Sequence, residues 1–268
     1  MKKLIVFALC LLSVFCVFAQ GEQEASGKTE LVVFGAASLT ESLTRIGDAY
    51  MAANPDVAIS FNFDSSGTLK TQIENGAVAD LFISAAPKQM NQLDITSSVN
   101  TQGLDFVLQG TRLNLLENKV TLAVPEGNPA GITTFDALAD SLKAGTVFLA
   151  IGNSDVPVGQ YTLEIFDYYG IDEAAIAKNL TYGSNVKEVT TQVSENSVDC
   201  GIIYGTDAYS AGLTVVDEAT AEMCSQVIYP AAVMKNSEHI EEAKAFLAYL
   251  QSDEAVAFFT EVGFSPAF

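Results

Sequence analysis

Short apolar runs alternate along the chain with longer segments in which apolar residues recur every three or four positions. The short β-branched and aromatic runs are typical of buried strands, and the longer spacing is typical of amphipathic helices. The predicted strands cover residues 30–34, 57–63, 80–84, 119–124, 146–151, 200–204 and 226–233. The predicted helices cover residues 39–52, 67–75, 87–92, 134–142, 158–169, 172–178, 186–195, 238–250 and 253–261. This alternation predicts an α/β fold with largely parallel sheets.

The first nineteen residues have the features of an export signal. Two lysines precede an apolar run that ends in Val17-Phe18-Ala19, where a signal peptidase finds the small residues that it needs. We therefore expect residues 1–19 to be a signal peptide and residues 20–28 to be a polar linker. The protein is then periplasmic, or otherwise outside the cytoplasm.

A lipid anchor at Cys16 is the alternative to full release from the membrane. The bulky Phe15 stands before it, where lipidation signals prefer a small residue. We therefore favour a soluble exported protein over a lipoprotein. No second stretch of the sequence has the length and hydropathy of a transmembrane helix.

The charge balance excludes some classes of partner. The chain carries 13 basic and 33 acidic residues, a formal charge of −20. Removing residues 1–19 takes away two lysines and leaves −22. A field of this sign does not attract nucleic acid or an anionic membrane. The charges are scattered and 49% of the residues are hydrophobic, so the chain is expected to fold, as one large domain or two lobes.

Motifs for catalysis and for metal binding are absent from the sequence. The single histidine, His239, opens a predicted helix on its solvent side, which is a poor position for a catalytic base. There is no nucleophile elbow, P-loop, dinucleotide-binding glycine motif or His/Cys cluster. The sequence therefore predicts a protein that is not an enzyme and has no cofactor or cation site.

One kind of junction recurs, in which small or polar residues lead from a strand into a helix. These junctions cover residues 34–38, 63–67, 151–159 and 180–186. In α/β sheets they lie at the carboxyl ends of the strands, where ligands bind. Helix N-termini carry unpaired N–H groups and partial positive charge. Several of them converging on one cleft would bind an anion without Lys or Arg.

Two of the junctions also match a capping box. Ser38 is followed three residues later by Glu41, and Asn185 is followed by Glu188. The pattern leaves two interpretations open: each residue is only a helix cap, or it also contacts a ligand.

At these same junctions the sequence resembles the periplasmic molybdate-binding proteins of ABC importers. The matching segments are VFGAASLTESL at 33–43, FNFDSSGTLKTQIENGAVADLFISA at 61–85, VPVGQY at 156–161 and CGIIYGTDA at 200–208. The second segment is the most specific of the four. The resemblance extends from Glu30 to Gly263.

The resemblance implies a two-lobe periplasmic-binding-protein fold of type II. Each lobe would be a mixed, mostly parallel sheet flanked by helices, with the ligand cleft between the lobes. The implied lobe I covers residues 29–121 and 230–268, and lobe II covers residues 122–229. Two apolar runs that meet proline, 119–124 and 226–233, are candidates for strands that cross between the lobes, although each also fits a strand that simply ends at a turn.

Carried over residue by residue, the family's oxyanion site falls on Ser38, Ser66, Val158, Val186 and Tyr204. The resemblance implies hydroxyl and N–H donors from the two serines, N–H donors from the two valines and the phenolic O–H of Tyr204. The implied ligand is molybdate, with tungstate as its near equivalent. The implied partner is a membrane ABC permease, to which a monomeric protein delivers the anion.

Two positions depart from the family pattern. Val158 stands where the family carries alanine, which matters little if only its N–H is used. Asp64 departs more seriously, and together with Asp155 it keeps sulfate, phosphate or another small anion open as the ligand. A hydrolase or transferase on the same scaffold is a further alternative, and it would need a nucleophile with a base. The sequence does not separate molybdate from tungstate.

The cysteines add an expectation about redox state. Cys10 and Cys16 leave with the signal peptide, so Cys200 and Cys224 are the remaining pair. A single pair in an exported chain suggests a disulfide. Two buried free thiols are the alternative.

Overall fold

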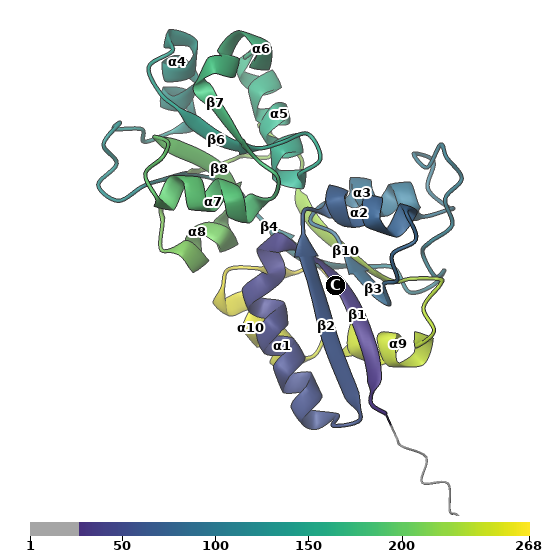
Figure 1. Ribbon diagram of the computed structural model, residues 1–268. Helices are drawn as coiled ribbons and strands as arrows, with labels where there is room; N and C mark the ends of the chain where they lie inside the picture. The colour runs from purple at the N-terminus through teal and green to yellow at the C-terminus, as the bar shows by residue number, and fades with distance from the viewer. Residues whose placement is uncertain (1–26) are drawn as a thin grey trace, which may run out of the picture.

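The computed structural model describes residues 27–268, which form two lobes, each built on a β-sheet with flanking helices (Figure 1). The expected signal peptide over 1–19, the alternative anchor at Cys16 and most of the linker over 20–28 lie outside the described residues. Within residues 27–268, no helix has the length and apolar character that crossing a membrane requires.

A six-stranded mixed sheet, in the order β11-β4-β10-β3-β1-β2, forms the core of one lobe. Its strands are β1 (Thr29–Ala36), β2 (Val57–Asp64), β3 (Leu81–Ile83), β4 (Leu113–Asn118), β10 (Val227–Val233) and β11 (Ser265–Pro266). β1 is parallel to β2 and β3, whereas β10 is antiparallel to β3 and β4. The helical elements of this lobe are η1 (Ala37–Leu39), α1 (Thr40–Ala53), α2 (Ser66–Glu74), α3 (Pro87–Leu93), α9 (Ile240–Tyr249) and α10 (Asp253–Glu261).

A five-stranded sheet, in the order β7-β6-β8-β5-β9, forms the core of the other lobe. Its strands are β5 (Val120–Val124), β6 (Leu149–Gly152), β7 (Leu180–Gly183), β8 (Cys200–Tyr204) and β9 (Thr214–Glu218). β6 is parallel to β7 and β8, and β5 is antiparallel to β8 and β9. The helical elements of this lobe are α4 (Phe135–Ala144), α5 (Pro157–Tyr169), α6 (Glu173–Ile176), η2 (Ala177–Asn179), α7 (Val186–Ser194) and α8 (Gly205–Ala211).

The chain passes between the sheets outside the strands. β4 ends at Asn118 and β5 begins at Val120 in the other sheet, and the return lies between β9 and β10. β5 belongs only to the five-stranded sheet, and β10 belongs only to the six-stranded sheet. Neither strand crosses between the lobes, so the alternative of a strand that simply ends at a turn describes both runs better. The lobe limits expected from the sequence, 29–121 with 230–268 and 122–229, stay a prediction.

The hydrophobic pattern located the helices well. Each predicted helix is present, with ends that agree within two residues, but α8 was not predicted. The strands β4, β7, β9 and β11 were also missed. β9 is exposed or half-buried along its whole length, so it lacks the buried apolar run by which strands were recognised.

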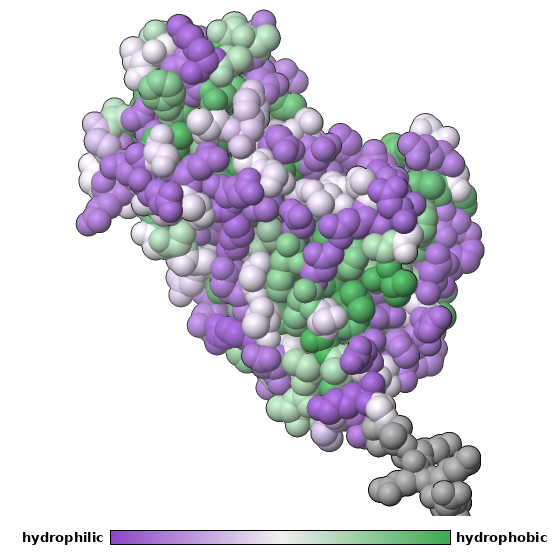
Figure 2. Space-filling model, viewed as in Figure 1, coloured by the Kyte–Doolittle hydropathy of each residue, from purple (hydrophilic) through white to green (hydrophobic). Residues whose placement is uncertain are grey.

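The helices that follow β1, β2, β6 and β7 all begin where the two lobes meet. The starts of α1, α2 and α5 lie close to this junction in Figure 1. On the face shown in Figure 2, hydrophilic residues border the notch between the lobes, whereas apolar residues gather over the strands of the six-stranded sheet. The fold therefore brings several helix N-termini to the boundary between the lobes.

The expected disulfide between Cys200 and Cys224 is absent, and both thiols are free. Cys200 begins β8, whereas Cys224 lines a cavity together with Val120, which pairs with Tyr204 at the other end of β8. The two ends of this strand are about 13 Å apart, and a disulfide needs Cα atoms within about 7 Å. The expectation of a disulfide is therefore corrected: the two thiols lie toward opposite ends of one strand.

We expect the exported chain, unfolded in iodoacetamide without reductant, to gain two carbamidomethyl groups. In the folded protein both thiols should react slowly, because burial raises the pKa of Cys200 to about 12 and that of Cys224 to about 11. Intact-mass spectrometry checks both statements. A chain that is labelled only after reduction would contradict the structure.

Candidate functional site

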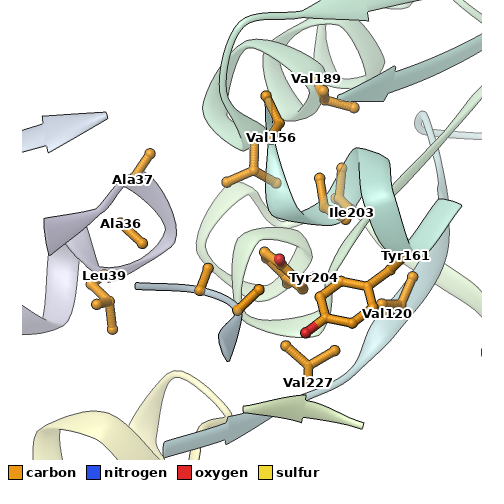
Figure 3. Close-up of a cluster of buried hydrophobic side chains, with 14 of the residues drawn as sticks. Ala36, Ala37, Leu39, Val120, Val156, Tyr161, Val189, Ile203, Tyr204 and Val227 are labelled. Carbon is orange, nitrogen blue, oxygen red and sulfur yellow. The ribbon is translucent and has the colours of Figure 1, made fainter. Parts of the chain in front are cut away.

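A small pocket lies between the two lobes. Its lining residues are Ala36, Ala37, Ser38, Ser65, Ser66, Ala85, Val156, Pro157, Val186 and Tyr204. Ala36 ends β1 and Ala37 begins η1; in Figure 3 they lie opposite Val156 and Tyr204 of the other lobe. Both sheets thus contribute to the pocket through the segments that follow their strands.

Four of the five residues expected at the site line this pocket. They are Ser38 and Ser66 from the six-stranded lobe and Val186 and Tyr204 from the five-stranded lobe. The fifth, Val158, is fully buried in the first turn of α5, directly after the lining residue Pro157.

Ser38 lies in η1 and does not cap α1. The N-cap position of α1 is Leu39, and no side chain caps that helix, so the capping box expected for Ser38 and Glu41 is wrong. Instead, Ser38 Oγ lies 2.8 Å from the hydroxyl of Tyr229, which comes from β10. The short 3₁₀ turn places the first residue of α1, Thr40, two positions beyond the serine, and the serine lines the pocket.

The bond between Ser38 and Tyr229 continues into a chain of hydrogen bonds behind the pocket. Asn118 Nδ2 donates to the Tyr229 hydroxyl at 3.2 Å and to Thr206 Oγ1 at 2.9 Å. Since the Tyr229 oxygen accepts from Asn118, its own proton is available for Ser38 Oγ. When Tyr229 donates to Ser38 Oγ, the Ser38 proton is free to point into the pocket, and Ser38 can then donate to a ligand.

Ser66 begins α2 but leaves the capping role to Ser65. Ser65 Oγ accepts from the N–H of Thr68 at 3.1 Å. Ser66 Oγ accepts from the N–H of Ala85 at 2.9 Å, which ties the start of α2 to the end of β3. Because its oxygen already accepts, the fully buried Ser66 hydroxyl has its proton available for the pocket.

The backbone N–H groups of Val158 and Val186 are in the first turns of α5 and α7. First-turn N–H groups have no acceptor within their own helix. Among residues 27–268, neither of these two donates a hydrogen bond. Asn185 is a true N-cap, since its side chain accepts from the N–H of Glu188 at 3.1 Å. The Glu188 carboxylate accepts from the N–H of Ser184 at 2.7 Å and not from that of Asn185, so the second capping box is confirmed for its cap alone.

Tyr204 presents a hydroxyl that is buried and without a partner. Its side chain is 1% exposed at the end of β8, and within the described part of the chain its oxygen makes no hydrogen bond. Its ring packs edge to face on Tyr161 and Tyr229, with centroids 6.5 and 6.0 Å away. Figure 3 shows Tyr161 beside Tyr204. Burial raises the pKa of Tyr204 well above its usual value, so this hydroxyl stays protonated and can donate.

The close approach of the lobes depends on a glycine beside Ser66. A Cβ on Gly67 would lie 2.2 Å from the carbonyl oxygen of Asp155, in the loop before α5. Any other residue at this position would push the lobes apart or shift that loop. In the sequence Ser65-Ser66-Gly67, the first serine caps α2, the second presents its hydroxyl to the pocket, and the glycine allows the two lobes to touch.

The two acidic residues that left the ligand open in the sequence do not line the pocket. Asp64 Oδ1 accepts from the N–H of Ser65 at 2.7 Å and from Asn185 Nδ2 at 3.4 Å. Asp155 is exposed. None of the lining residues is charged. Within residues 27–268, no group of three or more His, Cys, Asp or Glu side chains is arranged to hold a metal ion.

One charged cluster lies next to the pocket. Lys187 Nζ lies 2.8 Å from Glu41 and 3.1 Å from Asp207, whose side chain is fully buried. Burial raises the pKa of Asp207 to about 6, against the opposing effect of the Lys187 charge. Sequence reasoning did not identify this cluster, because its members are far apart in the chain and match no motif.

Comparison with known proteins gives consistent matches over nearly the whole chain. The profile of a family described as bacterial extracellular solute-binding protein matches residues 31–265. A Bacillus subtilis protein, named provisionally as an ABC transporter substrate-binding lipoprotein, is 34% identical over 95% of this chain and 94% of its own. The molybdate-binding protein ModA of Escherichia coli is 32% identical over 98% of both chains.

Solved structures share the fold at lower identity. The periplasmic molybdate-binding protein of Azotobacter vinelandii has a TM-score of 0.74 at 21% identity, covering 88% of this chain and 98% of its own. The sulfate-binding protein SubI of Mycobacterium tuberculosis has a TM-score of 0.68 at 20% identity, covering 89% and 87%. The two-lobe α/β fold expected from the sequence is therefore confirmed.

Replacing Asp207 by Asn should flatten the dependence of stability on pH between about pH 4 and 6. The pKa of about 6 in the folded state is above the ordinary value of 3.8, so protonation of Asp207 favours the folded protein. This contribution is complete below pH 3.8 and is lost as the pH rises through 6. Relative to Asp207→Asn, the free energy of unfolding of the wild type should fall by up to about 1.4 kcal/mol for each pH unit of increase in this window.

Urea unfolding of both proteins at pH 4, 5, 6 and 7 checks this expectation. The comparison is made as a difference between the two proteins, so that the titration of all other groups cancels. If the free energy of unfolding changed with pH in the same way for wild type and Asp207→Asn, the expectation would be contradicted.

Proposed function

Because the chain belongs to the family of bacterial extracellular solute-binding proteins, we propose that it captures molybdate, and also tungstate, and delivers it to an ABC permease. Its family and relatives are substrate-binding proteins of transporters, not enzymes. The observation that carries the choice of ligand is the pocket lining, in which donors from both lobes face one small space without a charged side chain.

The proposed site binds the anion by donated hydrogen bonds alone. Ser38 and Ser66 give hydroxyl protons, Val158 and Val186 give backbone N–H groups, and Tyr204 gives its phenolic proton. Hydrogen bonds to a charged group are worth about 1.5 to 3 kcal/mol each. A few of these, less the costs of closure and desolvation, are enough for the roughly −8 kcal/mol of micromolar binding.

A fully deprotonated dianion suits such a lining better than phosphate does. Phosphate near neutral pH keeps a proton that needs an acceptor, and leaving it unpaired costs about 1 to 3 kcal/mol. Asp64 was the candidate acceptor, but its Oδ1 is used by Ser65 and Asn185 and it does not line the pocket. This arrangement supports rejection of phosphate.

Sulfate carries no proton and is the stronger competitor. It has the same charge and shape as molybdate but is smaller, so in a closed pocket it cannot reach the donors of both lobes at once. Another small oxyanion such as sulfate remains the second candidate ligand, because a sulfate-binding protein shares the fold.

The remaining parts of the proposal concern where and how the protein acts. We propose that it works outside the cytoplasm as a monomer, without nucleic acid or a cofactor. Closure of the lobes around the anion would create the surface that the permease recognises, since the ligand contacts both lobes and stabilises the closed form.

Calorimetric titration of the desalted protein with molybdate, tungstate, sulfate and phosphate tests the proposed ligand. We expect micromolar or tighter binding of molybdate and tungstate, much weaker binding of sulfate and no measurable binding of phosphate. Binding of phosphate as tight as that of molybdate, abolished by Asp64→Ala, would replace the proposed ligand.

Tyr204→Phe should lower molybdate affinity about tenfold or more without lowering the melting temperature of the ligand-free protein. The variant removes a donor to the anion, but that hydroxyl has no partner among residues 27–268 to lose. Tyr161→Phe is the matched control, because Tyr161 is also buried and packs on Tyr204 but does not line the pocket. Equal affinity losses in the two variants would argue against a ligand contact at Tyr204.

Ser38→Ala and Ser66→Ala should also weaken binding about tenfold or more, but each should cost some stability. Ser38→Ala removes the partner of Tyr229, and Ser66→Ala leaves the N–H of Ala85 without its acceptor. Melting curves and titrations on the same samples separate the two effects. Loss of stability with unchanged affinity would reduce both serines to a structural role.

A further inference from the structure

Lys187 follows Val186 in α7, and its ammonium group joins carboxylates from the two lobes. Nζ lies 2.8 Å from each carboxylate oxygen of Glu41, in the first turn of α1. It also lies 3.1 Å from Oδ1 of Asp207, in the first turn of α8. One cation therefore links the six-stranded lobe to the five-stranded lobe directly beside the pocket.

The two carboxylates have different surroundings. Asp207 is fully buried, and no other cation of the described residues pairs with it. The Glu41 side chain is 44% exposed. A buried carboxylate without a cation is strongly disfavoured. Asp207 therefore keeps Lys187 in place within its own lobe, whereas the contact with Glu41 exists only while the lobes are together.

The ion pair is attached to the same elements as two of the proposed ligand contacts. Glu41 lies three residues beyond Ser38, and Lys187 is the residue after Val186. A bond between Lys187 and Glu41 thus fixes the distance between donors that approach the anion from opposite lobes. A second and weaker contact also joins the two lobes: Asn185 Nδ2 donates to Asp64 Oδ1 at 3.4 Å.

We propose that Lys187 is a positioning residue that holds the site closed: Asp207 fixes its ammonium group, and Glu41 is its partner across the cleft. This inference rests on the proposed binding of an oxyanion between the lobes. Lys187 does not line the pocket, so it acts on the equilibrium between open and closed forms and not on the choice of anion.

Glu41→Gln is the first test, because it leaves the pair of Lys187 and Asp207 intact and does not endanger folding. We expect molybdate affinity to fall about three- to tenfold, mainly through faster dissociation, with the ratio of molybdate to sulfate affinity unchanged. Lys187→Met should lower affinity at least as much. The double variant should lose no more than Lys187→Met alone, because both changes break the same bond.

The matched control is the ion pair of Lys244 and Glu241. Lys244 Nζ also lies 2.8 Å from Glu241 Oε1, but both residues are on α9 and join no two lobes. Glu241→Gln should leave molybdate affinity unchanged. Wild-type affinity in Glu41→Gln, or additive losses in the double variant, would overturn the proposal.

A second measurement separates failure of this inference from failure of the proposed function. If the wild type does not bind molybdate, the proposed ligand is wrong, and closure is then read from small-angle X-ray scattering of the ligand-free proteins. We expect a larger radius of gyration for Glu41→Gln than for the wild type and Glu241→Gln. In that case, equal radii for all three would overturn the role of Lys187.

Discussion

Backbone N–H groups in the first turn of a helix need an acceptor, and in this protein several of them meet at one pocket that supplies none. Val158 and Val186 bring such groups from one lobe, and Ser66 begins a helix in the other. The Tyr204 hydroxyl likewise has no hydrogen-bond partner within the part of the chain that the structure describes. A tetrahedral oxyanion would accept hydrogen bonds from all of these donors together. The fold, the glycine at position 67 and the contacts between the lobes all help to keep these donors close to one another.

The same constraint would allow a chain with a formal charge of −20 to bind the proposed anion. The field of the whole protein opposes approach, so binding depends on short-range dipoles and hydrogen bonds. The acidic side chains nearest the pocket are kept out of it by their own partners: Asp64 bonds Ser65 and Asn185, and Asp207 is paired with Lys187. Local pairing of carboxylates is therefore as important to the site as the donors themselves.

The sequence predicted most of the fold and named four residues that line the pocket, but it did not predict the contacts that support them. Periodicity located the helices, and the resemblance named Ser66, Val186 and Tyr204, because these features depend on residues close together in the chain. The chain of hydrogen bonds from Asn118 through Tyr229 to Ser38 joins residues up to 191 positions apart, so no local pattern could reveal it. The disulfide prediction was wrong for the same reason: the number of cysteines does not show that Cys200 begins β8 whereas Cys224 lies in the segment between β9 and β10.

The central claim is that one oxyanion sits between the lobes and is held by donors from both. A crystal structure grown with molybdate, with diffraction recorded on both sides of the molybdenum absorption edge, tests it most directly. The account predicts one strong anomalous peak in the pocket, within hydrogen-bonding distance of Ser38, Ser66, Tyr204 and the N–H groups of Val158 and Val186. A peak outside this pocket, or a pocket without molybdenum in crystals of saturated protein, would contradict it.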